Sequence, residues 1–348
     1  MSTGAGLDAQ LGTKTEVTVG TAVTADHFHV FDSADLTFVP SYLEGQGLRA
    51  GKQFKSVSQA GIARKMASGK IELPLMYKGM SWWMQHLFGA TGTLATVSGG
   101  TDAYEGYFTP AGLRGKSFTT QIGKPDPSTG TVEAFNYNGC KITDWDLAFA
   151  DNANTLLTVT VDAWNEVLGT PSLASATYAT DNKLFNFSDV TTFTLGGTPS
   201  TTTGVTSIDS GVDVVSVVSS LTLTGKNTLA TTRFGLGNAG VKKEQYEEDF
   251  TAITGTFSAE YHEAEFQSEF RAGTTTALQI DSVSTDFIED TTPYLFSVII
   301  PTVKITKAAA TVSGPGLVTV AGEFVVYDPD DGSNPPIQIH IVSTDTTL

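Results

Sequence analysis

Two distant stretches of the sequence repeat one pattern, and this echo constrains the fold more than any other feature. Residues 141–159 read KITDWDLAFADNANTLLTV, and residues 304–320 read KITKAAATVSGPGLVTV. Both begin with Lys-Ile-Thr and end on two apolar residues followed by Thr-Val, with a loop-like stretch between. Self-similarity of this kind indicates repeated structural units, so the echo predicts an internal duplication.

Further matching anchors follow one another in the same order in both halves. DLTF at 35–38 is matched by SLTL at 220–223, and each is followed by the one predicted helix of its half, SWWMQHLFGATGT at 81–93 and EAEFQSEFRAGTTT at 263–276. Each predicted helix ends at a glycine, Gly89 or Gly273, which suits a left-handed cap. SFTTQI at 117–122 is then matched with LFSVII at 295–300.

These anchors divide the chain into four segments. We expect an N-terminal arm at 1–23 that becomes ordered on assembly, a first repeat at 24–168, a connector at 169–211 and a second repeat at 212–348. The connector is rich in Gly, Ser, Thr and Pro and contains one predicted hairpin, KLFNFSDVTTFTL at 183–195. Apolar residues alternate with polar ones, as in IQIHI at 337–341, which is typical of half-buried strands. The predicted fold class is α+β, mainly β: two tandem β-sandwich domains, each with one short flanking helix.

The predicted helices carry the largest apolar side chains of their halves. A single helix on a sandwich must bury one large face, and aromatic residues supply the most area, which explains Trp82 and Trp83. Phe266 and Phe270, four residues apart, predict one apolar face on the second helix. The alternative function for the tryptophan pair is a stacking platform for a sugar or a nucleic-acid base.

Composition excludes several classes of function. Thirty-seven acidic residues against twenty basic ones give a formal charge of −17, which opposes binding to phosphate or anionic membranes. The single cysteine, Cys140, cannot form an internal disulfide and is interpreted as a small core residue rather than a reactive thiol. No secretion signal is recognised at the start, and the longest apolar run, near 294–301, is too short to span a bilayer, so we expect a soluble protein made in the cytoplasm.

No motif predicts an active site. GLGNAG at 235–240 matches a dinucleotide-binding spelling, but its flanks do not form a strand and a helix, so a glycine loop is favoured. His27 and His29 share one face of a predicted strand without a third ligand at a telling spacing. We therefore predict no catalytic, cofactor-binding or metal-binding residues and no cofactor.

One contrast in charge suggests a contact between subunits. Residues 43–65 hold five basic residues against Glu44, whereas the matching stretch of the second repeat, 241–250, holds four acidic residues against two lysines. Our hypothesis is that these loops meet across a subunit boundary, where complementary charge fixes register. The candidate contact residues are Arg49, Lys52, Lys55, Arg64, Lys65, Glu244, Glu247, Glu248 and Asp249.

Taken in order, several stretches resemble the major tail tube proteins of long-tailed, siphovirus-type bacteriophages, in particular those that infect actinobacteria. The likeness begins with GLDAQLGTKTEVTVGTAVT at 6–24 and continues through GLRAGKQF, WWMQHLFGATGT and FNYNGCKITDWDLAF. In the second half it continues through LTLTGKNTLATTRFG, AITGTFSAEY, FRAGTTTALQI and IIPTVKITKAAATVSGPGLVTVAGEF. The resemblance covers nearly the whole chain, and its specificity lies in the order of the motifs.

The resemblance implies a non-enzymatic structural protein of the virion tail, assembled in the host cytoplasm. Its sandwich would join neighbouring sheets into rings, and stacked rings would form the conduit for DNA ejection. The implied partners are further copies of the chain and the tape-measure, tail terminator and tail-tip proteins, while genome DNA passes without specific binding. A doubled subunit would fill two ring positions, so three chains would make a pseudo-hexamer; six chains per ring is the fallback.

Two other classes of function remain open from the residues alone. A β-sandwich binding module or adhesin on a virion or cell surface would explain the tryptophan pair but not the ordered repeat. A hydrolase on a β scaffold lacks a nucleophile or an acid pair to nominate.

Overall fold

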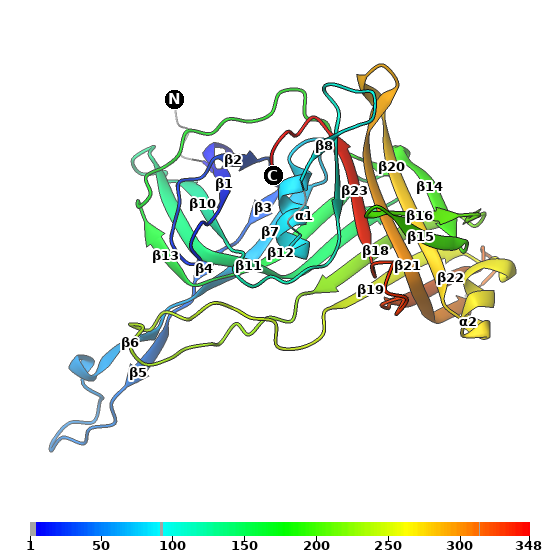
Figure 1. Ribbon diagram of the computed structural model, residues 1–348. Helices are drawn as coiled ribbons and strands as arrows, with labels where there is room; N and C mark the ends of the chain where they lie inside the picture. The colour runs from blue at the N-terminus through cyan, green and yellow to red at the C-terminus, as the bar shows by residue number, and fades with distance from the viewer. Residues whose placement is uncertain (1–4, 91–92, 313) are drawn as a thin grey trace.

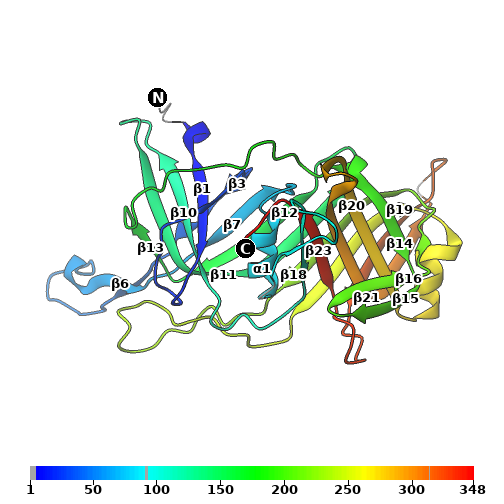
Figure 2. The same cartoon turned by 45° about the horizontal axis from the view of Figure 1, so that its top comes forward.

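The computed structural model describes residues 5–90, 93–312 and 314–348. The chain is mainly β with short helices, which confirms the predicted class (Figures 1 and 2). Each half is built from an outer and an inner antiparallel sheet that share one long, bent strand. Among the described residues, no helix is long and apolar enough to cross a membrane.

The first half is a sandwich whose two sheets share β11 (Val132–Ala150). The outer sheet has the order β2 (His27–His29), β1 (Gln10–Thr15), β10 (Phe118–Pro125), the first part of β11, and β13 (Asn165–Leu168). The inner sheet runs from the short strands β3 (Ser33–Ala34) and β4 (Thr37–Phe38) through β7 (Ala67–Pro74) and β12 (Leu156–Ala163) to the second part of β11.

The second half repeats this pairing order strand for strand, with β21 (Thr292–Thr311) as its long shared strand. Its outer sheet runs β17 (Val212–Asp213), β14 (Val190–Leu195), β20 (Thr276–Glu289), the first part of β21, and β23 (Gln338–Ser343). Its inner sheet runs β18 (Val218–Lys226), β19 (Ala252–Glu260), β22 (Thr319–Val326) and the second part of β21. In each half the Lys-Ile-Thr run lies where the long strand passes from one sheet to the other.

One pair of sequence anchors was matched wrongly. SFTTQI lies in β10, whose place in the second half is taken by β20, whereas LFSVII lies in β21 and corresponds to the first part of β11. Both stretches are largely buried strands that pair with their neighbour in the hairpin, so the sequence pattern alone does not distinguish a strand from its partner.

Two expected boundaries also need correction. Residues 10–15 of the expected N-terminal arm form β1, and the buried carboxylate of Glu16 holds the following turn by accepting from Ser117 Oγ at 2.6 Å and Gly139 N at 2.8 Å. The expected connector contains β14, which takes the position in the second half that β1 takes in the first. The hairpin in this connector is β15 (Thr198–Thr202) with β16 (Val205–Asp209), and residues 183–195 pair with other parts of the chain instead.

The two halves are joined through both layers. In the inner layer β18 pairs with the second part of β11, so the two inner sheets form one continuous sheet. In the outer layer β9 (Tyr104–Phe108), with β8 (Ala95–Thr96) beside it, leaves the first half and pairs with β23 of the second. Beyond β23, the carboxylate of Asp345 accepts a hydrogen bond of 2.7 Å from Gly79 N in the first half.

Helix α1 (Met80–Phe88) fills the first sandwich. Trp82 and Trp83 are almost fully buried, as predicted, and Gly89 ends the helix with φ +67°. The second predicted helix is a π-helical turn (Glu263–Gln267) followed by α2 (Ser268–Ala272), ended by Gly273 with φ +65°. The predicted apolar face there is wrong in part, because Phe266 is buried whereas Phe270 is 39% exposed: the π turn shifts their relative direction from that of an ideal helix.

Aromatic rings in the inner sheets lie over glycines of the neighbouring strand. A Cβ placed on Gly225 would lie 2.0 Å from Trp145, and one on Gly255 would lie 2.1 Å from Phe324. The strands approach closely at these points only because the glycines have no side chain.

A long connection follows the first inner strand in each half. The first, residues 39–66, contains β5 (Ser41–Glu44), a 3-10 turn (Val57–Gln59) and β6 (Ala60–Arg64), and we call it the arm. It projects from the body (Figure 1). The second, residues 227–251, we call the strap, and it runs back along the first half. Further 3-10 turns lie at Gly6–Asp8 and Phe187–Asp189.

Candidate assembly surface

The seam between the two halves is a regular antiparallel strand pair. β11 and β18 align from Asp144 opposite Lys226 to Ala150 opposite Ser220. On the solvent-facing side Asp146 accepts a hydrogen bond of 2.6 Å from Thr224 Oγ1. On the core side Trp145 packs over Gly225. The seam thus uses backbone pairing and side-chain complementarity between two units that are alike in topology.

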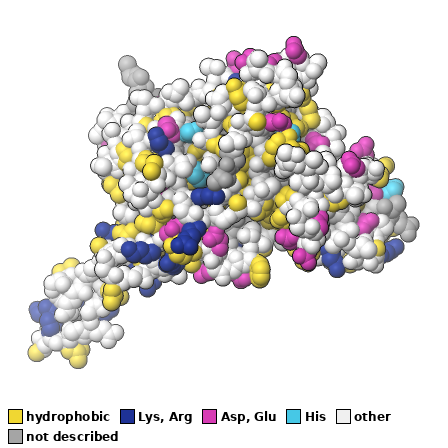
Figure 3. All heavy atoms as spheres, viewed as in Figure 1, with side chains coloured by type: hydrophobic (Ala, Val, Ile, Leu, Met, Phe, Trp, Pro, Cys, Tyr) yellow, Lys and Arg dark blue, Asp and Glu magenta, His cyan; other side chains and the backbone are white. Residues whose placement is uncertain are grey.

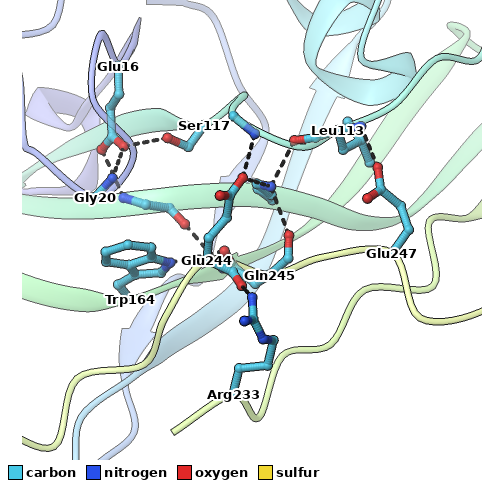
Figure 4. A network of polar contacts seen from close by, with 12 residues as sticks. Glu16, Gly20, Leu113, Ser117, Trp164, Arg233, Glu244, Gln245 and Glu247 are labelled. Carbon is cyan, nitrogen blue, oxygen red and sulfur yellow. Dashed lines mark hydrogen bonds and ion pairs between the residues drawn. The ribbon is translucent and has the colours of Figure 1, made fainter. Parts of the chain in front are cut away.

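The strap reinforces the seam through side chains that point into the first half (Figure 4). Glu244 receives hydrogen bonds from Lys141 Nζ at 2.9 Å and from Gly115 N at 2.5 Å. Gln245 accepts from Trp164 Nε1 at 3.0 Å, and Glu247 accepts from Leu113 N. These contacts tie the strap to the middle of β11, to the loop before β10 and to the junction of β12 and β13.

A second ion pair lies beneath the strap. Lys242 Nζ contacts both carboxylate oxygens of Asp162, at 2.5 and 2.6 Å, and the Lys242 side chain has no exposed area. Gln245 Nε2 adds a hydrogen bond of 2.8 Å to the same carboxylate. A buried charge without such partners would be strongly unfavourable, so the pair fixes the strap in one register.

Burial and pairing act in opposite directions on these groups. Burial lowers the pKa of Lys141 and of Lys242 below the ordinary lysine value, and it raises the pKa of Asp162. For Glu244, burial alone would raise the pKa, but the hydrogen bonds from Lys141 and Gly115 outweigh it and the pKa ends below its ordinary value. Each charged group under the strap is therefore stabilised by its partner rather than by water.

The basic candidate residues lie on the arm or at its base. Arg49, Lys52 and Lys55 belong to the arm, where Lys55 pairs with Glu44 at 2.5 Å. At the base, the Arg64 guanidinium lies 4.7 Å from the centre of the Phe234 ring, and Lys65 N donates to Gly240 O at 2.8 Å. The base of the arm and the tip of the strap are thus neighbours within one chain, through backbone and aromatic contacts and not through opposite charges.

The acidic candidate residues differ in availability. Glu244 and Glu247 are engaged within the chain, whereas Glu248 and Asp249 are exposed. Sequence reasoning did not identify Lys141, Lys242 or Gln245, which carry most of the strap contacts. The only sequence signal was the Lys-Ile-Thr run that begins at Lys141, and it indicated a repeat rather than a contact.

The continuous inner sheet has two ends. Among the described residues, the second part of β21 pairs only with β22 at one end, and its residues Ala309 and Ala310 are exposed. At the other end, the outer edge of β7 pairs, within the same described ranges, only with the two short strands β3 and β4. Strand edges of this kind are templates for pairing with another chain.

The residues that could have supported other functions are buried or lack partners for chemistry. The tryptophan pair is inside the core and offers no platform to a sugar or a base. Cys140 is fully buried, and burial raises the pKa of its thiol above the ordinary range. Within the described ranges, no group of three His, Cys, Asp or Glu side chains could hold a metal ion.

Comparison with known protein families gives a match. The family model described as phage tail tube protein matches residues 6–326, which is nearly the whole chain. No curated protein matches the sequence. The chain therefore belongs to the phage tail tube protein family, a family of structural components of the virion tail.

Proposed function

We propose that three copies of this chain close into a ring and that stacked rings form the conduit for DNA ejection in a siphovirus-type phage of actinobacteria. The observation that carries the proposal is the seam. It joins the first strand of one half to the long strand of the other, and the same two kinds of strand stand free at the ends of the inner sheet. Repeating the seam between chains, with β3 and β4 against β21, would close a ring.

The size of such a ring suits its role. The inner sheet has eight strand positions per chain if β3 and β4 count as one, so three chains supply twenty-four. With strands about 4.8 Å apart and tilted by about 40°, the barrel would be roughly 45–50 Å across between backbones. That width accommodates a DNA duplex. The duplication would make the three-chain ring a pseudo-hexamer, each half filling one of six positions.

The solvent-facing side of the inner sheet suits passage without binding. Threonine hydroxyl groups lie on this side of several neighbouring strands, at Thr158, Thr160, Thr222, Thr224, Thr254 and Thr256. Charges of both signs lie among them, as in the ion pair of Lys307 with Glu323 at 2.6 Å. A wall of this kind lacks the basic stripe that grips phosphates. The remaining partners would be the tape-measure, tail terminator and tail-tip proteins.

Negative-stain microscopy of the purified chain at rising concentration tests the proposal. We expect rings or tubes whose end views show three-fold symmetry with six similar lobes. Six-fold rings of twice the mass would support the fallback of six chains. Monodisperse monomers at every concentration would refute self-assembly, and glycan binding by such monomers would favour the adhesin alternative.

A further inference from the structure

The surface that the strap covers in the first half has a counterpart in the second half. Trp164 N donates to Asn138 O at 2.8 Å just after β12, and Tyr327 N donates to Thr302 O at 3.0 Å just after β22. Equivalent lysines, Lys141 and Lys304, stand three residues after Asn138 and two residues after Thr302, at the head of the repeated Lys-Ile-Thr run; each pairs with the residue two positions before Trp164 or Tyr327. The two surfaces therefore have the same backbone frame.

The two surfaces differ in what lies over them. In the first half the strap covers the surface, and the Lys141 side chain is only 1% exposed. In the second half Tyr327 is 47% exposed, and Lys304 has no ion pair among the described residues. The surface around Lys304 and Tyr327 thus has the same backbone arrangement as the surface that binds the strap, but no segment of the described chain covers Tyr327 as the strap covers Lys141.

The arm is the segment that corresponds to the strap. Each connects the first inner strand of its half to the second: the arm leads into β7 and the strap into β19. Gln59 stands ten residues before Gly69, as Gln245 stands ten residues before Gly255, and the two glycines hold matching places in the sheet. The arm carries exposed apolar side chains, such as Phe54 at 87%, and it projects away from its own chain.

Charge also fits the arm to the open surface. The arm carries five basic residues against Glu44, and Figure 3 shows Lys and Arg side chains gathered on it and at its base. Directly after Tyr327 the chain continues with three exposed acidic residues, Asp328, Asp330 and Asp331, and the loop up to Pro336 contains no basic residue. The arm is thus basic, and the loop that follows Tyr327 is acidic.

We propose that the arm of one chain docks across the surface around Lys304, Tyr327 and Asp328–Asp331 of the preceding chain, as the strap docks across the first half of its own chain. The inference rests on the proposed ring, because in that ring the β3 and β4 edge of one chain lies beside β21 of the preceding one. Gln59 would then approach Tyr327 as Gln245 approaches Trp164. Arms and straps together would form a continuous belt around the ring.

Disulfide trapping in assembled tubes tests the docking. The double variant Gln59→Cys with Tyr327→Cys should give, on mild oxidation, chains linked to one another up to a closed set of three on a non-reducing gel. The matched control is Gln59→Cys with Tyr178→Cys, because Tyr178 is a similarly exposed tyrosine, at 42%, in the other half. The single variants report any contribution of the buried Cys140. Tubes without crosslinks in the double variant would overturn the docking and leave the ring intact, whereas absence of tubes from the unmodified chain would refute the ring itself.

A charge pair provides a second measurement if the cysteine variant does not assemble. Lys52→Glu should slow tube growth about two- to fivefold, the effect of losing an exposed attraction. Asp330→Asn keeps a residue type that tolerates the φ of +55° at this position, and in the Lys52→Glu background it should restore part of the rate. Equal growth of Lys52→Glu and the unmodified chain, or no rescue by Asp330→Asn, would contradict the docking.

Discussion

Gly225→Ala tests whether the seam depends on the close approach of Trp145. The Cβ of the new alanine would lie 2.0 Å from Trp145 Cε2, whereas an ordinary contact is 3.4–4 Å. The indole would have to move by about 1.5 Å or the strands would have to separate, and the ring is only 3% exposed and in edge contact with Phe88 at 5.8 Å between centres. Overpacking of this kind costs about 1–3 kcal/mol.

The assay is thermal unfolding followed by tryptophan fluorescence and circular dichroism. Gly61→Ala is the matched control, because Gly61 is also in a strand but has no atom within 4 Å of an added Cβ. That variant should unfold within about 0.5 kcal/mol of the parent, since surface changes without such contacts are usually that small. Trp145→Phe removes the indole atoms nearest to Gly225, so in this background Gly225→Ala should cost at least about 1 kcal/mol less. A Gly225→Ala chain that unfolds like Gly61→Ala, or equal costs in both backgrounds, would refute the packing argument.

Two further predictions concern buried ionisable groups. Lys242→Met leaves the Asp162 carboxylate buried without its cation, so the free energy of unfolding should fall by about 3–5 kcal/mol. The double variant Lys242→Met with Asp162→Leu removes both charges and should lose clearly less stability. Urea unfolding and limited proteolysis of the strap measure both losses, and equal losses would contradict the pairing. Burial lowers the pKa of His29 and His86 to about 3; the nearby charge of His27, and of Lys116 for His86, adds a smaller effect in the same direction. In the unfolded chain both imidazoles have the ordinary pKa of 6.5, so below pH 6.5 the unfolded chain binds more protons than the folded chain. The stability contributed by each neutral, buried imidazole should be fully present above pH 6.5 and should fall by about 1.4 kcal/mol per pH unit as the pH drops towards 3. In acid titrations of unfolding, His86→Phe should show about half the slope of the parent. An unchanged slope would argue against burial of a neutral ring.

Local patterns predicted the strands, the helix caps and the burial of Trp82 and Trp83, because period-two alternation and glycine caps depend on neighbours in sequence. The same information could not decide which strand pairs with which, and so SFTTQI was matched to the wrong strand. From the sequence, β1 was placed in the N-terminal segment 1–23 and β14 in the connector 169–211, because each joins a sheet by pairing with a strand more than eighty residues away. The contacts of Lys242 and Gln245 are likewise a product of the path of the strap, which no local pattern encodes.

The outer layer has a consequence for the timing of synthesis. β9 pairs on one side with the nearby β8, but its other edge pairs with β23, which is synthesised more than two hundred residues later; Asp345, beyond β23, accepts from Gly79 N just before α1. A nascent chain on the ribosome therefore keeps this edge of β9 unpaired until β23 has been synthesised. A chain cut short before β23 would leave this edge of β9 unpaired and the outer layer between the two halves open.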